Sequence, residues 1–404
     1  MSVINTRASE ASHKNIESND EKKMSSFIGL YFILRTVNTM VSTSGVLSAM
    51  TNRGILAFMA IILAINLIII LPIVLKRNAL IFILVEFIAV VVYFSSIIIN
   101  QILITQIISR LFWTVCACIP LGICAISIRD KRQLYHIMLN TSYIMAAILS
   151  LLLLIRTSNE DYMMNFSNAM LYPCLFSINE YIAKKKVWHL LLNIYCIMTI
   201  LLFGSRGAFL CIIVFVTLRL FMYIRRPYVK ITFLCSLTIA VAYFDEIFKW
   251  GMGLLANIGI TSRSILLLKD NITYIGSRDT IWQIAKEMVN ERWLTGWGVV
   301  GELNKLDIYP HSIYLEIMIG FGVLLGGVIL AALCVLVIRM LRIKEPYLMT
   351  LCLVFFSIST RLFISGTYLT SEAFFLFIFL AACRDKQISL TNESLKIDNE
   401  IQLV

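Results

Sequence analysis

Residues 55–75 read ILAFMAIILAINLIIILPIVL, and residues 79–99 read ALIFILVEFIAVVVYFSSIII. Only Lys76, Arg77 and Asn78 separate these two runs. A helix needs roughly 20 apolar residues to cross the hydrocarbon core of a bilayer, and each run meets that length. Comparable apolar runs recur along most of the chain. The sequence therefore predicts an all-α polytopic membrane protein.

Composition supports this fold class and excludes several others. Hydrophobic residues make up 59% of the 404 residues, charged residues make up 15%, and the mean hydropathy is +0.85. Globular domains carry about 25% charged residues, so a soluble fold would lack the polar surface that it needs. The ten cysteines lie almost entirely within apolar runs and show neither C-x-x-C pairs nor zinc spacing, so disulfides, metal sites and cofactors are not expected.

The net charge of +11 is carried by short basic clusters between the apolar runs. This distribution follows the positive-inside rule and does not indicate nucleic-acid binding. Alternation of the clusters predicts about twelve spans with both termini in the cytoplasm. Residues 1–24 are expected to form a disordered cytoplasmic tail, 25–384 the transmembrane domain, and 385–404 a second cytoplasmic tail.

The same topology places three distant segments on the outer face. They are Ser205–Gly207, the long loop 245–311 between spans nine and ten, and the turn at Ser365–Gly366. Because these segments are expected to share one side of the membrane, we expect them to form a functional site together.

The polar end of the long loop contains the most informative stretch. Apolar residues recur at helical spacing over 276–293 and charged residues fall on the opposite face, which predicts an amphipathic helix. Trp282 and Trp293 suit the lipid headgroup boundary. Arg278 would stand in the first turn, where free backbone N–H groups and a guanidinium favour phosphate binding. The alternative is an interfacial helix whose arginine only touches lipid headgroups. A flexible glycine-rich turn is expected to follow.

Two further residues complete the candidate set. Arg206 lies between Gly204 and Gly207 where one apolar run ends and the next begins, so it must find an anionic partner or snorkel to the surface. His311 follows Tyr309 and Pro310 at the start of span ten. A single histidine there could equally be polar trim at a helix start.

The other charged residues and motifs provide less information about function. Arg35 and Arg110 lie within predicted spans, and the sequence assigns them no partner. No P-loop, Ser-His-Asp order or glycosidase-type carboxylate pair is present. The remaining groups are arginine, histidine and backbone N–H, which can handle a pyrophosphate leaving group without a metal.

The motifs resemble those of the O-antigen ligase/O-antigen polymerase superfamily over roughly residues 190–340. They are GSRG (204–207), GSRDTIW (276–282), ERWLTGWG (291–298) and YPHSIYLEIMIGFG (309–322). Ser312 departs from the pattern, because an asparagine often follows the histidine in this family.

This resemblance implies a metal-independent, C-type integral-membrane glycosyltransferase that uses an undecaprenyl-pyrophosphate-linked glycan. By motif position, Arg206 and Arg278 would be catalytic residues that bind the pyrophosphate, and His311 would orient or deprotonate the acceptor hydroxyl. Tyr309, Glu316 and Trp282 are weaker candidates for substrate positioning. The loop 245–311 would close over the donor.

The resemblance leaves the reaction open. The favoured reading is a polymerase of O-antigen (lipopolysaccharide) or capsule repeat units on the outer face of the bacterial inner membrane, working with a chain-length regulator and a flippase. The first alternative is a ligase that transfers glycan to lipid A–core. A non-enzymatic flippase for lipid-linked oligosaccharide is an alternative of another class, although it would not need His311.

Overall fold

The computed structural model describes residues 2–43, 49–155, 164–203, 206–224, 277–306 and 308–383, together with 226, 228–232, 235 and 243. Its α-helices are α1 (Ser2–Thr43), α2 (Ala49–Ile99), α3 (Ile104–Trp113), α4 (Ile119–Ser127), α5 (Lys131–Ile155), α6 (Met164–Lys184), α7 (Val187–Leu202), α8 (Arg206–Tyr223), α12 (Ser277–Glu291), α13 (Ile313–Met340), α14 (Pro346–Ser359) and α15 (Glu372–Ala382). The short helices are η1 (Gln101–Leu103), η2 (Thr114–Cys118, a π-turn), η3 (Gly301–Asn304), η4 (Thr360–Phe363) and η5 (Tyr368–Thr370). No strand occurs in these described parts.

The predicted fold class is confirmed. Six helical stretches are long and apolar enough to cross a membrane, and three further apolar helices are shorter. The predicted spans two and three form one element, α2, which changes direction at Asn78 (φ −142°, ψ 38°). The fourth predicted span contains α3, the π-turn and α4. Most of the predicted ninth span, which ends near Phe244, lies outside the described residues.

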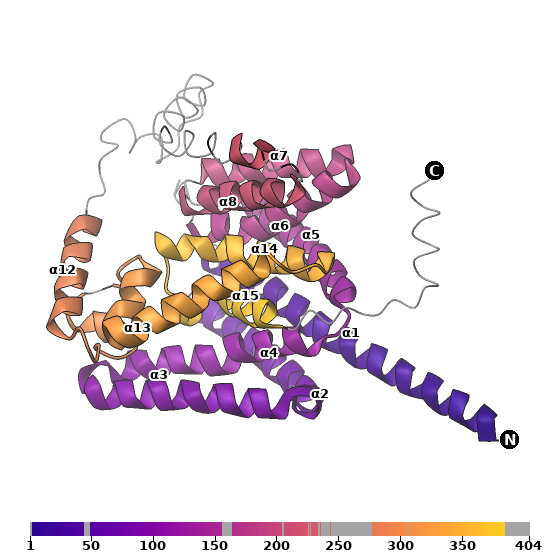
Figure 1. Ribbon diagram of the computed structural model, residues 1–404, viewed down its shortest axis with the longest axis horizontal. Coiled ribbons are helices and arrows are strands. Elements are labelled where there is room, and N and C mark those ends of the chain that lie inside the picture. Colours follow the sequence, from indigo (N-terminus) through magenta and orange to yellow (C-terminus); the bar gives the residue numbers. More distant parts are fainter. Residues whose placement is uncertain are drawn as a thin grey trace.

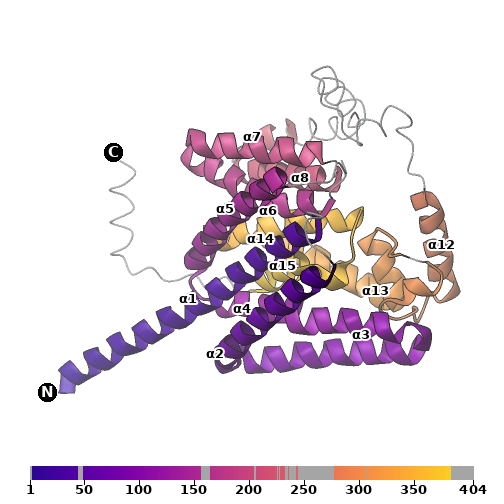
Figure 2. The same ribbon diagram turned by 180° about the vertical axis from the view of Figure 1, so that it is seen from behind.

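The core of the bundle consists of the helices that bury the most apolar surface. Buried side chains from α1, α4, α5, α6, α14 and α15 form one continuous cluster. Figure 2 shows α1 running between α5 and α2, and α1 packs against both. At Gly122 in α4, a Cβ would approach the Phe379 ring of α15 to 2.0 Å, so these two helices need a glycine at their contact. Many large apolar side chains on α2 and the second half of α13 face outward, as lipid contact requires.

The N-terminal segment differs from the prediction. Helix α1 begins at Ser2, so residues 2–24 are helical where a disordered tail was expected. Its first part projects from the bundle in Figure 1. Glu21 is 6% exposed and Met24 is fully buried, so packing against the bundle already starts within the segment that was predicted to be a tail.

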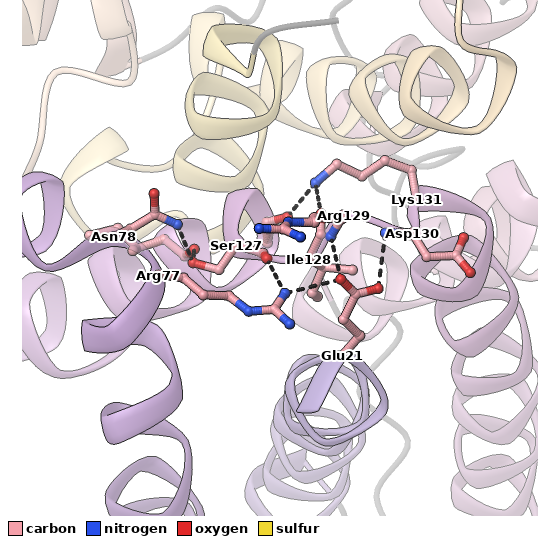
Figure 3. Close-up of polar contacts among 10 residues, drawn as sticks. Glu21, Arg77, Asn78, Ser127, Ile128, Arg129, Asp130 and Lys131 are labelled. Atoms are coloured by element: carbon pink, nitrogen blue, oxygen red, sulfur yellow. Dashed lines mark hydrogen bonds and ion pairs between the residues drawn. The ribbon is translucent and has the colours of Figure 1, made fainter. Parts of the chain in front are cut away.

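A cluster of polar contacts explains this early packing (Figure 3). Arg77 donates to Glu21 over 3.0 Å and to the Ser127 carbonyl over 2.8 Å. The Glu21 carboxylate also accepts the backbone N–H groups of Arg129 and Asp130 at 3.2 and 3.1 Å. The basic clusters 76–77 and 129–132 therefore lie at the same end of the bundle, in agreement with the predicted alternation.

Helix α13 is broken near its middle. Gly322 has φ 71° and ψ 176°, which no helical residue adopts, so the element consists of a first half from Ile313 and a second half that continues to Met340. Span ten was predicted as one uninterrupted run. The break positions the functional site, because the outer loop is bonded to it.

Candidate functional site

The loop after α12 is attached to the break in α13 by backbone hydrogen bonds. The N–H groups of Trp297 and Gly298 donate to the carbonyls of Ile319 and Gly320 at 2.7 and 2.9 Å. Val323 donates back to the Trp293 carbonyl at 2.6 Å. These bonds satisfy backbone groups that the helix break would otherwise leave unpaired.

Glycine is required at two positions of this attachment. A Cβ at Gly296 (φ 68°) would lie 2.5 Å from the Gly320 carbonyl oxygen. A Cβ at Gly322 (φ 71°) would lie 2.5 Å from the Leu294 carbonyl oxygen. The turn that was expected to be flexible is therefore docked tightly, and the ERWLTGWG and GFG motifs are two halves of one contact.

The end of α2 holds the same loop from another side. The Ser96 hydroxyl accepts the Val299 N–H at 2.8 Å, and Asn100 donates to the Trp297 carbonyl. Asn304 donates to the Asn100 side-chain oxygen at 2.6 Å. The loop thus connects α2 and α13, which lie far apart in the sequence.

The predicted amphipathic helix is confirmed as α12, but its apolar face has a different partner. Ala285 and Met288 are fully buried in a cluster with Leu315 and Ile319 of α13. The Trp282 indole donates to the Pro310 carbonyl at 3.0 Å, so this side chain fixes the turn before α13. Trp293 is 56% exposed. Of the two tryptophans expected at the headgroup boundary, Trp282 is instead a contact within the protein.

His311 stands in a strained turn. Its φ is 54°, a left-handed conformation that only a few per cent of non-glycine residues adopt, histidine, asparagine and aspartate more often than others. The rings of Tyr309 and His311 meet edge-on with centroids 4.5 Å apart. Pro310, held by Trp282, lies between them in the chain. The backbone and both neighbours thus fix the histidine at the mouth of α13, and such stored strain is concentrated at functional sites.

A buried polar network lies beside this turn. Glu302 and Glu316 are 1% and 2% exposed. Arg110 Nη1 lies 4.0 Å from Glu302 Oε1 and donates to the Thr367 hydroxyl at 3.3 Å. Thr367 donates to Glu316, whose second oxygen accepts the Tyr368 N–H at 3.4 Å. Glu316 therefore holds the 367–370 turn against the start of α13.

Burial raises the pKa of the Glu302 carboxyl, while its own backbone N–H and the Arg110 guanidinium lower that pKa in part. The network gives Arg110 the partner that sequence reasoning could not assign. Residues 110 and 302 are too far apart in the chain for any local pattern to connect them.

Arg35 also receives a partner from a distant helix. Its Nε lies 3.5 Å from Glu372 Oε1, and the same oxygen accepts the Tyr31 hydroxyl at 2.7 Å. The guanidinium lies 5.0 Å from the centroid of the Trp113 ring, where a cation–π contact adds to the ion pair. Sequence reasoning missed this cluster, although a charged residue in an apolar run is itself a signal for one.

The structure places the backbones of Arg206 and Arg278, and their side chains lie outside the described residues. Arg206 is the first residue of α8, and Arg278 stands in the first turn of α12. A Cβ at Gly207 would lie 3.4 Å from Ile364 and 3.9 Å from the Arg361 Cβ, so the start of α8 adjoins the turn after α14.

The convergence of Ser205–Gly207, the loop 245–311 and the Ser365–Gly366 turn stays a prediction, and the structure shows two contacts between neighbouring segments. The 206–207 segment meets residues 361–364, and the start of α13 meets Thr367 and Tyr368. Residues 244–276 of the loop lie outside the described chain. In the parts that the structure describes, no three His, Cys, Asp or Glu side chains are grouped so as to hold a metal ion.

Residues 191–331 match the family model described as O-antigen ligase. This match supports the resemblance to the O-antigen ligase/polymerase superfamily that the motifs indicate. The matched stretch runs from α7 into α13 and contains Arg206, Arg278 and His311. No curated protein and no solved structure matches the chain significantly.

The match points to a multi-pass membrane enzyme of the glycosyltransferase type, with activity of the O-antigen ligase/polymerase kind on a lipid-linked oligosaccharide. Three of the four motifs meet in the structure: residues 291–298 and 309–322 at the α13 break, and residues 276–282 at the His311 turn.

Proposed function

We propose that the protein polymerises oligosaccharide repeat units carried on undecaprenyl pyrophosphate into O-antigen or capsular polysaccharide. The observation that carries this proposal is the O-antigen ligase match, which includes all three candidate site residues in one stretch. The reaction takes place on the outer face of the bacterial inner membrane, with both termini in the cytoplasm. A chain-length regulator and a flippase of the same pathway are the expected partners.

In the proposed reaction, a sugar hydroxyl of the acceptor attacks the anomeric carbon of the donor glycan. The bond between this carbon and the phosphate oxygen breaks, and undecaprenyl pyrophosphate leaves with the bonding electrons. His311 takes the proton of the attacking hydroxyl, for which an imidazole with a pKa near 6.5 is suited. Arg206 and Arg278 stabilise the negative charge that develops on the leaving pyrophosphate, so the step needs no metal.

The geometry around the candidate residues supports these roles. Both arginines stand at the start of a helix, where free N–H groups and the helix dipole favour an anion. The Tyr309 ring and the Trp282 bond to Pro310 hold His311 in place. A histidine that was only polar trim would not need a left-handed backbone and two aromatic supports.

The first test uses purified protein and undecaprenyl-pyrophosphate-linked repeat units, with chelator present and no added metal. We expect a ladder of polymer lengths on a gel. Replacement of Arg206 or Arg278 by Ala should lower the rate about 10²–10³-fold, the usual effect of removing a group that stabilises developing charge. Replacement of His311 by Ala should lower it about 10²–10⁴-fold.

His311→Asn separates the ring from the backbone. Asparagine tolerates the left-handed conformation better than other non-glycine residues, so this variant should fold at least as well as the wild type while losing the ladder. A full ladder from His311→Asn or Arg278→Ala would refute the site assignment.

Transfer of glycan only to lipid A–core would favour the ligase. Movement of donor across vesicles without any new glycosidic bond would favour the flippase.

A further inference from the structure

Arg361 is a half-buried arginine that the sequence alone does not mark as a site residue. It lies in η4, directly after α14, and ends an apolar run that reads as an ordinary span. Its Nε is buried and has no hydrogen-bond partner among the described residues. An unpaired polar group in such a place is costly, and this cost is high for a charged one.

Three other arginines in apolar surroundings are paired with glutamate side chains. Arg77 is paired with Glu21, Arg35 with Glu372, and Arg110 with Glu302. No carboxylate lies within ion-pair distance of Arg361 in the described part of the chain. Three comparable cations are thus neutralised internally, whereas Arg361, like Arg219 in α8, has no carboxylate partner in the described part of the chain and is available to an anion from outside it.

The position of Arg361 indicates which anion. Two contacts fix η4 against α8: the Cys211 thiol donates to the Ile358 carbonyl at 3.7 Å, and the Thr360 hydroxyl contacts the Cys211 sulfur at 3.6 Å. The Arg361 Cβ lies 3.9 Å from the position that a Cβ on Gly207 would take. Arg361 therefore stands beside the first turn of α8, where Arg206 begins the helix.

We propose that Arg361 is a further binding residue of the donor site and contacts the pyrophosphate of the lipid-linked donor together with Arg206. This inference rests on the proposed function. A pyrophosphate diester carries two negative charges and several acceptor oxygens, which a second guanidinium close to the start of α8 can bind. The backbone of η4 that carries Arg361 is held against α8 by the contact between Thr360 and Cys211.

A phospholipid headgroup offers the same phosphate chemistry, so the test must separate the two sources. We suggest measuring binding of undecaprenyl pyrophosphate and, separately, of phosphatidylglycerol to the full-length protein in nonionic detergent. The variants are Arg361→Gln and Arg361→Lys. The matched control is Arg219→Gln, because Arg219 also has a buried Nε without a partner but lies in the last turns of the same helix α8, near Tyr135.

Arg361→Gln should weaken undecaprenyl pyrophosphate binding about 10- to 100-fold, as expected for the loss of a hydrogen bond to a charged group. Arg361→Lys should recover part of the affinity, and Arg219→Gln should bind like the wild type. Phosphatidylglycerol binding should be the same in all four proteins. In the polymerisation assay, Arg361→Gln should raise the donor KM more than it lowers kcat.

Three outcomes would overturn the inference. Unchanged undecaprenyl pyrophosphate binding by both Arg361 variants would do so, as would an equal loss from Arg219→Gln. A parallel loss of phosphatidylglycerol binding would assign Arg361 to lipid headgroups instead. Failure of the wild type to bind undecaprenyl pyrophosphate would contradict the proposed function itself, which distinguishes the two failures. If Arg361→Gln does not fold, Arg361→Lys still decides, because loss of the planar guanidinium alone should weaken binding.

Discussion

At the scale of single residues, the buried carboxyl of Glu302 makes a prediction about pH. Its pKa is raised by burial, so the folded state binds its proton more tightly than the unfolded state does. The stability contributed by this proton is fully present below the ordinary carboxyl pKa of about 4.3 and is lost as pH rises through the raised value. Thermal unfolding of the protein in detergent should therefore give a lower midpoint as pH rises above about 5.

Glu302→Gln keeps the shape of the side chain and removes the titration. Its unfolding midpoint should fall less between pH 5 and 8 than that of the wild type. Glu316 and Arg110 face the same site, so the slope should shrink and not vanish. An unchanged slope would show that Glu302 does not titrate in this range.

The sequence could identify single unusual residues, but it could not predict which distant residues they contact. The local context of Arg278, Arg206 and His311 was sufficient to select them, because each interrupts an apolar pattern. The partners of Arg35 and Arg110 could not be found this way. Tyr31 and Glu372 are separated by 341 positions, and only the folded bundle brings them together. The left-handed backbone of His311 is likewise a product of packing around Pro310.

At the scale of elements, the break in α13 predicts unequal effects of two neighbouring glycines. Gly322→Ala places a Cβ 2.5 Å from the Leu294 carbonyl oxygen and forces alanine into a φ/ψ region that essentially only glycine adopts, which alone costs roughly 1–3 kcal/mol. Gly327→Ala is the matched control, because a Cβ there meets nothing within 4 Å. We expect Gly322→Ala to lower both the unfolding midpoint and the polymerisation rate, and Gly327→Ala to change neither.

Protease cleavage in the 292–301 loop should report the same difference, since the loop loses its backbone bonds when the break is distorted. Equal behaviour of the two alanine variants would mean that the loop does not depend on the glycine contact. Gly296→Ala offers an independent check from the other side, because its Cβ would lie 2.5 Å from the Gly320 carbonyl oxygen.

The sequence predicted helix α12 but did not predict the break in α13. The amphipathic period over 276–293 predicted α12 because one side of the helix is polar, whichever surface the other side meets. The identity of that surface was wrong, since Ala285 and Met288 pack against α13. The break itself has no local signature, because glycine is common in transmembrane helices. It becomes visible only when the loop carbonyls approach Gly322.

At the scale of the whole molecule, hydropathy and charge predicted the architecture well. The apolar runs became helices, and the basic clusters 76–77 and 129–132 meet at one end around Glu21. The early packing of α1 was not predictable from composition, because Glu21 lies in a polar stretch and is held by contacts with Arg77 and with the backbone at 129–130. Hydropathy measures transfer into lipid and does not detect such polar contacts.

The two ends of the bundle lead to the last prediction, which concerns sidedness. Gln283 is exposed on α12 at the end that carries the candidate site. Lys186 is exposed between α6 and α7. Lys186 lies at the same end of the bundle as Lys131, where α5 begins. The Tyr135 hydroxyl near the start of α5 donates to Glu180 near the end of α6 at 2.6 Å, so these two helix ends are adjacent. The proposed topology puts Gln283 outside and Lys186 inside. In intact bacterial cells, a membrane-impermeant maleimide should therefore label Gln283→Cys and leave Lys186→Cys unlabelled until the cells are permeabilised.

The native cysteines set the background of this experiment, so the unsubstituted protein is the control for both variants. Six of the ten are buried in the described structure, Cys116 and Cys334 are exposed on apolar helices, Cys235 is exposed, and Cys383 is partly exposed. Labelling of Lys186→Cys in intact cells would invert the topology. The His311 turn would then face the cytoplasm, where a polymerase of exported glycans would have no use for it. Labelling of both variants in intact cells would instead contradict the assignment of Gln283 and Lys186 to opposite sides of the membrane, on which the outer site depends.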